Sequence, residues 1–382
     1  MKIAFIPSTF LPNIGGAEIQ AHNLANSLIK EKNEVEIFLL NNVSIENANY
    51  KIVKLNKYFI SFVFLMKYYF YLNFSFLLRL YFKNIIQKKK FDIWHFHSVN
   101  YKTLIYIDEL KKLNQKVVVT LQGADIQSDK EIKYGYRLDK KYDVYLKKVF
   151  QNVDSFHAIS SDISKELLDI GIKKDKIIII PNCSPVEKIK SFNKKKNETL
   201  TLLTIGRYIV KKKGFDLVEK VARELENITN FKWIIIGRNT KELLKNKYIK
   251  DNLNRFEIVD QINNESETFF PSSDLIKFYK NSDVYVNLAR VEGSPLVLID
   301  AIASNIPIVT FNTRGGNELV LEGINGFIID NFDYKLFAKK IHSSQNFLIN
   351  ENNHEVSNHI NHFDLTENTK KIINCYNFLS QN

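Results

Sequence analysis

The segment from Arg290 to Val309 places two carboxylates and a helix start at a spacing suited to a phosphate-bearing ligand. Glu292 stands in a Glu-Gly-Ser-Pro turn, and Asp300 follows eight positions later. We expect a helix to begin after Pro295, which puts Asp300 about a turn and a half inside it. Because the first backbone N–H groups of a helix have no partner within it, they suit a phosphate. The two acids would then face different parts of one ligand, with a negative group between them.

A cluster of cations in the sequence TIGRYIVKKKGFD could bind the same kind of group. Arg207 follows a predicted strand, and Lys212 and Lys213 precede Gly214 and a predicted helix. Cations at the carboxyl end of a strand can neutralise a departing diphosphate in place of a metal ion. The alternative is a solvated basic turn.

A pair of glycines follows the first apolar run of the chain. Lys2–Ser8 is predicted as a buried strand, and the next loop, FLPNIGGAE, places Gly15 and Gly16 before a helix with Glu18 in its first turn. Glycines at such a turn let the backbone approach a diphosphate without a Cβ clash. An ordinary turn is the alternative reading.

Polar side chains also follow three later strands of the N-terminal half. His95 and His97 share one face of a strand in DIWHFHS. TLQGADI places Gln122 and Asp125 at a second strand end, and Ser160–Asp162 follows a third. Two histidines without further ligands do not predict a zinc site. Gln122 can hydrogen-bond a ligand hydroxyl but cannot transfer protons, and a plain strand-end turn is the alternative.

Apolar, strand-like runs alternate with helical stretches through both halves of the chain. After Lys2–Ser8, the predicted strands are Glu34–Leu40, Ile93–His97, Val117–Leu121, Phe156–Ser160, Ile177–Ile180, Leu200–Gly206, Trp233–Gly237, Asp283–Ala289, Ile306–Phe311 and Phe327–Asp330. This alternation predicts an α/β protein with two doubly wound parallel sheets. Ligands of such sheets bind at the carboxyl ends of the strands, where the residues above fall.

The lysine- and asparagine-rich stretch after Asn182 has no helical periodicity and separates the two sets of strands. We expect an N-terminal domain over residues 1–182, a linker over 183–199 and a C-terminal domain over 200–360. A last helix falls within residues 361–382. Two domains of ordinary size fit a chain of 382 residues.

Five motifs occur in the order found in one enzyme family. GGAE, the H-x-H strand end, G-R…K-G, E-x7-(E/D) and the G-G-x-x-E of Gly315–Glu318 together resemble the retaining glycosyltransferases of the GT-B fold, family 4 type, or glycosyl transferases group 1. The resemblance spans almost the whole chain and implies two Rossmann-like domains that face a cleft. This chain departs from the family pattern at Gln122, where many relatives have histidine, and at Asp300, where they have glutamate. One residue is also inserted before Gly214.

The resemblance implies a role for each motif. Glu292 would hydrogen-bond the transferred sugar and offset oxocarbenium charge, and Asp300 would bind the ribose. Arg207 would stabilise the departing diphosphate together with Lys212 or Lys213. In the family the glycine pair faces the donor diphosphate and the acceptor, and the last helix crosses back to the first domain. Gly315 and Gly316 would permit close approach of the backbone to a ligand, and Glu318 would open the next helix. The further donor-binding residues implied are Gly15, Gly16, Gly293, Ser294, Pro295 and Leu296, and those on the acceptor side are Glu18, His95, His97, Gln122 and Asp125.

The implied reaction moves a hexosyl group from a nucleoside diphosphate sugar, UDP-sugar by default, to a lipid-linked, surface-polysaccharide or lipopolysaccharide precursor. Retention would need no enzymic nucleophile, because leaving group and acceptor can meet on one face of the sugar. No Asp-x-Asp pair stands at a suitable strand end, so we expect no metal and no cofactor beyond the donor. Two alternatives stay open: a sugar-nucleotide epimerase or hydrolase on the same fold, and a nucleotide-sugar-binding protein with weak catalysis.

The segment Tyr58–Phe82 is unusually aromatic, with Phe or Tyr at 12 of its 25 positions. Nine basic residues and no acid fall within Asn47–Phe91, which ends in Lys88–Lys90 and Phe91. Such a composition suits a surface that lies on an anionic bilayer. Lys67 and Arg79 interrupt the segment, so it lacks the ~18–20 apolar residues of a spanning helix. A pair of buried helices is the alternative, and no motif indicates nucleic acid.

The charge and cysteine content favour a cytoplasmic protein with an anionic partner. The net charge is +12, of which +9 falls in residues 1–182. Cys183 and Cys375 make neither a disulfide framework nor a metal site, as in a reducing compartment. The N-terminus is predicted as a strand and not a signal peptide. We therefore expect a cytoplasmic protein that lies peripherally on the inner face of the cell membrane.

Overall fold

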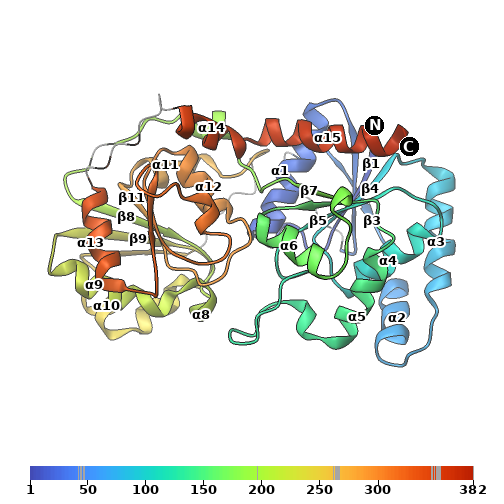
Figure 1. The fold of residues 1–382 in the computed structure, drawn as a ribbon, viewed down its shortest axis with the longest axis horizontal. Helices are drawn as coiled ribbons and strands as arrows, with labels where there is room; N and C mark the ends of the chain where they lie inside the picture. Colours follow the sequence, from blue (N-terminus) through green and yellow to red (C-terminus); the bar gives the residue numbers. More distant parts are fainter. Residues whose placement is uncertain are drawn as a thin grey trace. The chain divides into compact units, whose positions relative to one another are not determined.

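A computed structural model of the chain (Figure 1) describes residues 1–382 except 42, 44, 46–47, 196, 261, 263–266, 346, 348, 350–353 and 382. The chain divides into two compact units. The first takes in Met1–Pro181, the short segment that ends at Thr268, and the end of the chain from Asn368. The second runs from Asn182 to Glu367 apart from that short segment. Each unit is built on a parallel sheet, so the predicted fold class is confirmed.

The first unit contains a seven-stranded sheet in which each strand runs parallel to its neighbours. In spatial order the strands are β3 (Lys51–Lys54), β2 (Glu34–Leu39), β1 (Lys2–Pro7), β4 (Ile93–His97), β5 (Val117–Leu121), β6 (Ser155–Ala158) and β7 (Ile177–Ile179). Strands β4 and β5 are fully buried, as strands covered on both faces must be. The chain order reverses beside β1, because β2 and β4 flank it, and parallel sheets bind ligands at such switch points.

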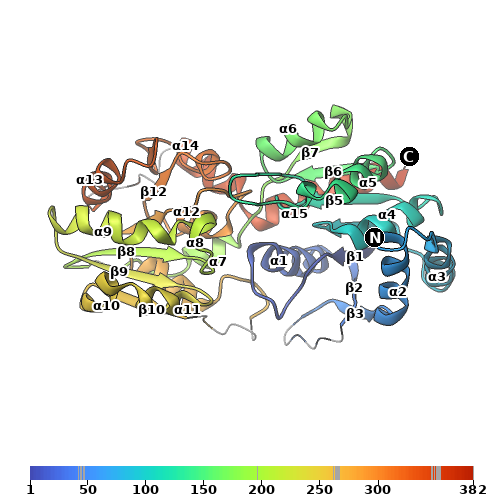
Figure 2. The same cartoon turned by 90° about the horizontal axis from the view of Figure 1, so that it is seen from below.

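Helices lie on both sides of this sheet (Figures 1 and 2). They are α1 (Gly16–Lys30), α2 (Lys57–Tyr68), α3 (Ser75–Lys88), α4 (Tyr101–Lys111), α5 (Lys140–Phe150), α6 (Ser161–Asp169) and most of α15 (Leu365–Gln381), with short 3-10 turns η1 (Tyr136–Leu138) and η2 (Lys174–Lys176). Asn56, Asn100 and Ser160 cap α2, α4 and α6 by accepting backbone N–H groups of the first turn. In the part of the chain that the structure describes, no helix is both long and apolar enough to cross a bilayer.

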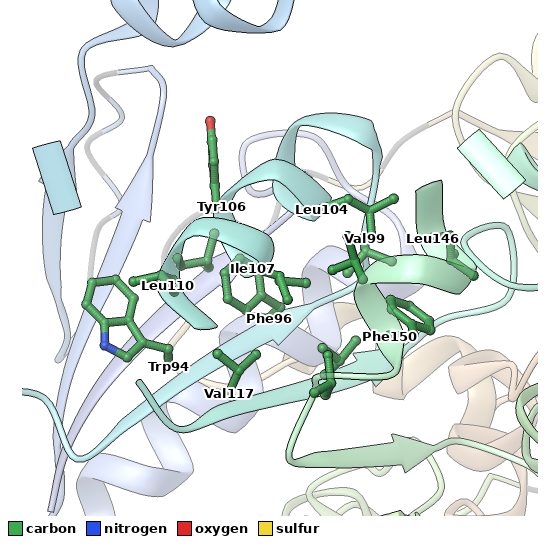
Figure 3. Close-up of a cluster of buried hydrophobic side chains, with 14 of the residues drawn as sticks. Trp94, Phe96, Val99, Leu104, Tyr106, Ile107, Leu110, Val117, Leu146 and Phe150 are labelled. Carbon is green, nitrogen blue, oxygen red and sulfur yellow. The ribbon is translucent and has the colours of Figure 1, made fainter. Parts of the chain in front are cut away.

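The core of the first unit lies between β4 and β5 and the helices α4 and α5 (Figure 3). Trp94 and Phe96 extend from β4 toward Ile107 and Leu110 of α4, and Phe150 of α5 lies beside them. All five side chains are buried. Because each helix gives one apolar stripe to the sheet, burial of these side chains holds the strand ends in fixed positions.

The second unit contains a six-stranded parallel sheet. Its strands, in spatial order, are β10 (Phe256–Val259), β9 (Phe231–Ile236), β8 (Leu200–Ile205), β11 (Val284–Asn287), β12 (Ile308–Phe311) and β13 (Gly326–Ile329). Its helices are α7 (Val186–Lys190), α8 (Val210–Lys213), α9 (Val218–Glu226), α10 (Lys247–Asp251), α11 (Ser273–Lys280), α12 (Leu296–Ala303), α13 (Tyr334–Ser344) and α14 (His354–His362), with 3-10 turns η3 (Phe215–Leu217), η4 (Thr240–Lys245) and η5 (Asn317–Leu319). The chain order reverses between β8 and β11, where the loops that carry the predicted cations and Glu292 begin.

The structure differs from the sequence-based expectation in three places. The edge strands β3 and β10 were not predicted, because KIVK and FEIV are only four residues long and carry charged side chains. The expected linker over 183–199 contains α7, whose Val186 and Ile189 are buried one turn apart. Glu318 lies in the 3-10 turn η5 and does not open an α-helix.

We predict that Phe82→Ala lowers the free energy of unfolding of the first unit by about 3–5 kcal/mol, because it leaves a cavity in the core. The Phe82 side chain is fully buried, and its ring contacts those of Trp94 and Tyr106 with centroids 5.8 and 5.5 Å away. Phe76 lies on the same helix and is 49% exposed, so Phe76→Ala should change stability by only about 0.5 kcal/mol. Urea denaturation of both variants measures the difference, and equal losses would contradict this packing.

Candidate active site

The centre of the candidate site is an ion pair between Lys213 and Glu292 in the second unit. Lys213 ends the short helix α8, which follows β8, and Glu292 lies in the loop between β11 and α12. The Lys213 ammonium donates to Oε1 of Glu292. The side chains are only 20% and 9% exposed, so the pair lies in a poorly solvated position where charge interactions are strong.

The two loops that carry this pair are joined to each other by further contacts. Arg290 donates to both carboxylate oxygens of Asp216 at 2.7 and 3.0 Å and to the Lys211 carbonyl at 2.7 Å. The backbone N–H of Arg290 also donates to the Lys212 carbonyl at 2.8 Å. Since β8 and β11 are neighbours in the sheet, these bonds hold both loops over one edge.

Glycine is required where these loops pass close to other backbone atoms. Gly214 has φ +70°, and a Cβ there would come within 1.9 Å of the Leu288 carbonyl oxygen. Gly315 has φ +71°, and a Cβ there would come within 2.6 Å of the Glu292 carbonyl oxygen. The first glycine of the G-G-x-x-E motif therefore packs against the backbone of the Glu292 loop. The sequence had suggested that this glycine approaches a ligand.

Two further cations lie near the ion pair. Burial lowers the pKa of Lys212 to about 8, and the charges of Lys213 and Arg207 lower it as well. The Glu292 carboxylate acts on Lys212 in the opposite direction. Arg207 itself is exposed just after β8. The structure thus brings Lys213 and Lys212 to the Glu292 carboxylate and places Arg207 near Lys212.

The start of α12 lies next to Glu292, as the sequence suggested. Ser294 and Leu296 are buried there, and Gly293 is partly exposed. Pro295 is the N-cap of the helix and contributes no side-chain cap. The Ser294 hydroxyl is buried and has no hydrogen-bond partner within the described residues, whereas the Ser294 carbonyl accepts from the Asn182 side chain at 2.9 Å.

Asp300 is buried one turn inside α12. Its carboxylate accepts a hydrogen bond from the Ser184 hydroxyl. Burial raises the pKa of Asp300 to about 7, while the Ser184 hydrogen bond and the charge of Lys188 lower it. Ser184 and Lys188 lie in the stretch that was expected to be a linker, and the sequence contains no local signal for their contact with Asp300.

The glycine pair of the first unit lies at the start of α1. Gly15 is the extended N-cap residue, and Gly16 opens the helix. A Cβ at Gly16 would meet no described atom within 4 Å outside its immediate chain neighbours, so packing does not require this glycine. Glu18 is buried, and its carboxylate accepts from the Thr9 hydroxyl at 2.6 Å. This bond ties the first turn of α1 to the loop after β1.

The predicted acceptor-side residues fall into two groups. His97 and Gln122 meet at the ends of β4 and β5, where the Gln122 amide nitrogen lies 3.0 Å from Nε2 of His97. Burial lowers the pKa of His97 to about 3, so the ring is neutral at pH 7. Asp125 is fully buried and accepts the backbone N–H groups of Gln122 and Gly123 at 2.9–3.0 Å, which shapes this loop.

His95 belongs to the interior of the first unit. It has no exposed surface and is hydrogen-bonded to the Thr120 hydroxyl at 2.7 Å and to the Tyr376 hydroxyl of α15. Burial holds the pKa of His95 well below its ordinary value. The contact explains how α15 docks on this sheet, and we leave His95 out of the proposed acceptor contacts. Within the described residues no group of three or more His, Cys, Asp or Glu could hold a metal ion.

Two Rossmann-like units with this constellation define a glycosyltransferase of the GT-B fold. Residues 14–188 match the family described as Glycosyltransferase Family 4, and residues 185–355 match Glycosyl transferases group 1. The chain therefore belongs to the group 1 glycosyltransferases.

Known relatives and solved structures agree with this assignment. An uncharacterized glycosyltransferase of Methanocaldococcus jannaschii, MJ1178, is 26% identical over 86% of this chain and 84% of its own length. A UDP-Gal:α-D-GlcNAc-diphosphoundecaprenol α-1,3-galactosyltransferase of Escherichia coli is 26% identical over 67% of each chain. Anabaena Alr3699/HepE in complex with UDP has the same fold, with a TM-score of 0.71 and 14% identity over 98% of this chain and 99% of its own.

We predict that Asp300→Asn changes how stability depends on pH. The pKa of Asp300 is about 7 in the folded chain against an ordinary value of 3.8, so its contribution to stability is present below 3.8 and is lost as pH rises through about 7. Asparagine removes this loss. Between about pH 4 and pH 8 the variant should gain up to about 4 kcal/mol relative to the wild type.

Urea denaturation at both pH values measures this change. Asp274→Asn is the control, because Asp274 is 68% exposed on α11 of the same unit and pairs only at the surface with Lys277. If the free energy of unfolding depends on pH in the same way for the wild type and Asp300→Asn, the raised pKa of the buried Asp300 is contradicted.

Proposed function

We propose that this glycosyltransferase moves a hexosyl group from a nucleoside diphosphate sugar and retains the anomeric configuration of that group. UDP-hexose is the first candidate for the donor. The proposed acceptor is a lipid-linked precursor or a precursor of a surface polysaccharide or lipopolysaccharide. The observation that carries the proposal is the Lys213–Glu292 ion pair with Lys212 and Arg207 beside it. A cluster with more cations than acids, at the carboxyl ends of β8 and β11 and beside the start of α12, suits a diphosphate.

The names of relatives support the substrate class. The E. coli relative is named for transfer to a diphosphoundecaprenol-linked sugar, and CapM of Staphylococcus aureus, 29% identical over 48% of this chain, for capsular polysaccharide biosynthesis. The Anabaena protein was solved with UDP and with UDP-glucose. These features favour UDP-hexose and an acceptor attached to a lipid or a growing glycan.

Donor binding would exchange the partner of Lys213. In the free protein the Lys213 ammonium pairs with Glu292. A diphosphate that enters beside Arg207 and Lys212 competes for this ammonium, because it carries more negative charge than one carboxylate. The exchange leaves the Glu292 carboxylate free to accept hydrogen bonds from the sugar hydroxyls and to offset positive charge at the anomeric carbon.

The remaining groups would hold the donor and acceptor. The first N–H groups of α12 and the unpartnered Ser294 hydroxyl would bind phosphate oxygens, and Asp300 would accept hydrogen bonds from the ribose. Gly16, which has open space where a side chain would be, would admit the diphosphate and the acceptor close to the backbone. Because protein cations would neutralise the leaving group, we propose that no divalent ion is required.

We predict that Glu292→Gln lowers the rate of glycosyl transfer roughly 100-fold or more, since glutamine keeps the shape but offers no negative charge to the transition state. Donor affinity should be unchanged or higher, because Lys213 is then free for the diphosphate. A thermal-shift screen of UDP-, GDP- and ADP-hexoses identifies the donor, and mass spectrometry of the products measures the rate.

Glu257→Gln is the matched control. Glu257 forms a lysine–glutamate pair in the same unit, with Lys232 at 2.5 Å, but both side chains are substantially exposed. Its loss should leave the rate within about twofold, as expected of a surface ion pair. A wild-type rate for Glu292→Gln would exclude the proposed role, and an isomerised nucleotide sugar or free sugar as the only product would favour an epimerase or hydrolase.

We also propose that the helix pair α2–α3 places the protein peripherally on the cytoplasmic face of the cell membrane. One side of the pair is in the core, through Ile60, Val63, Leu78 and Phe82. The other side and the connecting loop leave large apolar side chains exposed. These are Tyr58, Phe62, Leu65, Tyr69, Phe70, Tyr71, Leu72, Phe76 and Leu80, with exposed fractions between 42% and 87%.

This exposed aromatic face lies in the part of the sequence without acids. The lysines at 57, 83, 88 and 90 therefore add positive charge to a segment that itself contains no carboxylate. Lys67 is different, because its ammonium is directed inward to the Tyr145 hydroxyl at 2.7 Å and Ser75 at 3.2 Å. Exposed aromatic rings with flanking lysines suit the headgroup region of an anionic bilayer.

We predict that Phe70→Ser with Leu72→Ser weakens binding to anionic vesicles by about tenfold or more at low salt, because each apolar side chain contributes roughly 1.5–3 kcal/mol when fully buried. Both residues are more than half exposed, so the melting temperature should not change. The control, Val144→Ser with Leu168→Ser, removes two exposed apolar side chains of α5 and α6 in the same unit. Vesicle co-sedimentation measures both, and equal binding of the two double variants would contradict this orientation.

A further inference from the structure

A cavity of about 210 Å³ lies in the first unit, above the carboxyl ends of the adjacent strands β2, β1 and β4. It is bounded by the loop after β1, the end of β2 and the first turns of α4. This is the switch point of the sheet, where the chain leaves β1 and β4 toward different helices. None of the residues that the sequence predicted for the donor or acceptor lines this cavity.

Tyr106 of α4 lines the cavity, and it carries a polar atom that nothing in the described chain satisfies. Its side chain is 3% exposed, and its hydroxyl has no hydrogen-bond partner among the described residues. Figure 3 shows the ring directed away from Ile107 and Leu110, with the hydroxyl at the far end from the apolar cluster. A buried hydroxyl without a partner is unfavourable, so this group indicates a bound oxygen or nitrogen atom.

The charge of the cavity is positive. Lys102 lines it one helical turn before Tyr106, so the two side chains lie on the same face of α4. The Lys102 ammonium lies 5.1 Å from the centre of the Phe64 ring of α2. The described lining residues include no aspartate or glutamate. An anionic group is therefore favoured beside the Tyr106 hydroxyl.

The rest of the lining is largely apolar. Ile6, Phe38, Leu39 and Leu55 are buried and contribute to one wall. An apolar cavity of about 150 Å³ is enough to admit a benzene ring, so this one can take a short branched hydrocarbon chain. Asn100 and Thr103 also line it, but their side chains already cap α4, because each accepts the backbone N–H of the other residue. The ligand should therefore be amphipathic, with an anion next to hydrocarbon.

We propose that this cavity binds the lipid phosphate of the acceptor, with the Tyr106 hydroxyl donating to a phosphate oxygen, Lys102 neutralising its charge and the apolar wall holding the first hydrocarbon unit. The inference rests on the lipid-linked acceptor proposed above and names where its lipid end is recognised. Phe64, which lies beneath Lys102, belongs to α2, so the cavity adjoins the helix pair that carries the exposed aromatic face.

The test uses the full chain and three probes: geranyl phosphate, geraniol and inorganic phosphate. Isothermal titration should show binding of geranyl phosphate at least about tenfold tighter than either of the other two. Tyr106→Phe and Lys102→Gln should each lower the affinity for geranyl phosphate by about tenfold, which is the usual loss for a hydrogen bond to a charged group. Tyr106→Phe should leave geraniol binding unchanged.

Stability separates recognition from a structural role. Because the Tyr106 hydroxyl has no partner in the described chain, Tyr106→Phe should leave the melting temperature unchanged or raise it. Tyr248→Phe is the matched control: it removes a hydroxyl bonded to Glu226 at 2.7 Å in the second unit and should leave geranyl phosphate binding unchanged. Equal binding of the probe by wild type and Tyr106→Phe, or equally tight binding of inorganic phosphate, would overturn the proposal.

Failure of this inference can be told from failure of the proposed function. If glycosyl transfer depends on Glu292 but geranyl phosphate does not bind, the proposed reaction is supported and the proposed lipid site is excluded. Binding of geranyl phosphate that depends on Tyr106, without any binding of nucleotide sugars, would keep the site and overturn the proposed reaction.

Discussion

The ion pair between Lys213 and Glu292 is the interaction on which the candidate site depends. Taking both charges out of water has a cost that their attraction offsets only when the geometry is good, so a largely buried pair of this kind is weak evidence for stability. The pair matters for ligand binding because of the charges that surround it. Arg207 and Lys212 leave the region with an excess of positive charge, and this excess is what a diphosphate would neutralise.

The neighbouring structure can be understood as support for that pair. The Arg290–Asp216 contacts hold the loops after β8 and β11 together, and Gly214 and Gly315 allow backbone approaches that a side chain would prevent. The buried Asp300 is fixed by Ser184 at the start of the second unit. These contacts do not involve the Lys213 or Glu292 side chains, so those two side chains can change partners without a change in the fold.

In the first unit, hydrogen-bond partners distinguish buried groups that look alike in the sequence. His95 is part of the interior, where Tyr376 of α15 hydrogen-bonds to its ring, while His97, two residues on, meets Gln122 at the strand ends. Tyr106 is as buried as a core tyrosine, yet it lines a cavity and its hydroxyl has no partner in the described chain. The same residue type therefore serves packing at one position and offers a binding group at another.

The sequence by itself determined the two parallel sheets, because runs such as VVVTL and LTLLTI are apolar enough to be buried on both faces and are separated by helical periods. It also determined that Arg207, Lys212, Lys213 and Glu292 stand in segments that follow predicted strands, since Arg207 comes directly after one strand and the other three lie within seven residues of a strand end. Only the tertiary structure decided that Ser184 binds Asp300, 116 residues away, that Tyr376 hydrogen-bonds His95, 281 residues away, and that Tyr106 lines a cavity. Local periodicity and turn chemistry are carried by neighbouring residues, whereas burial and partner choice depend on how distant segments pack, which no local pattern records.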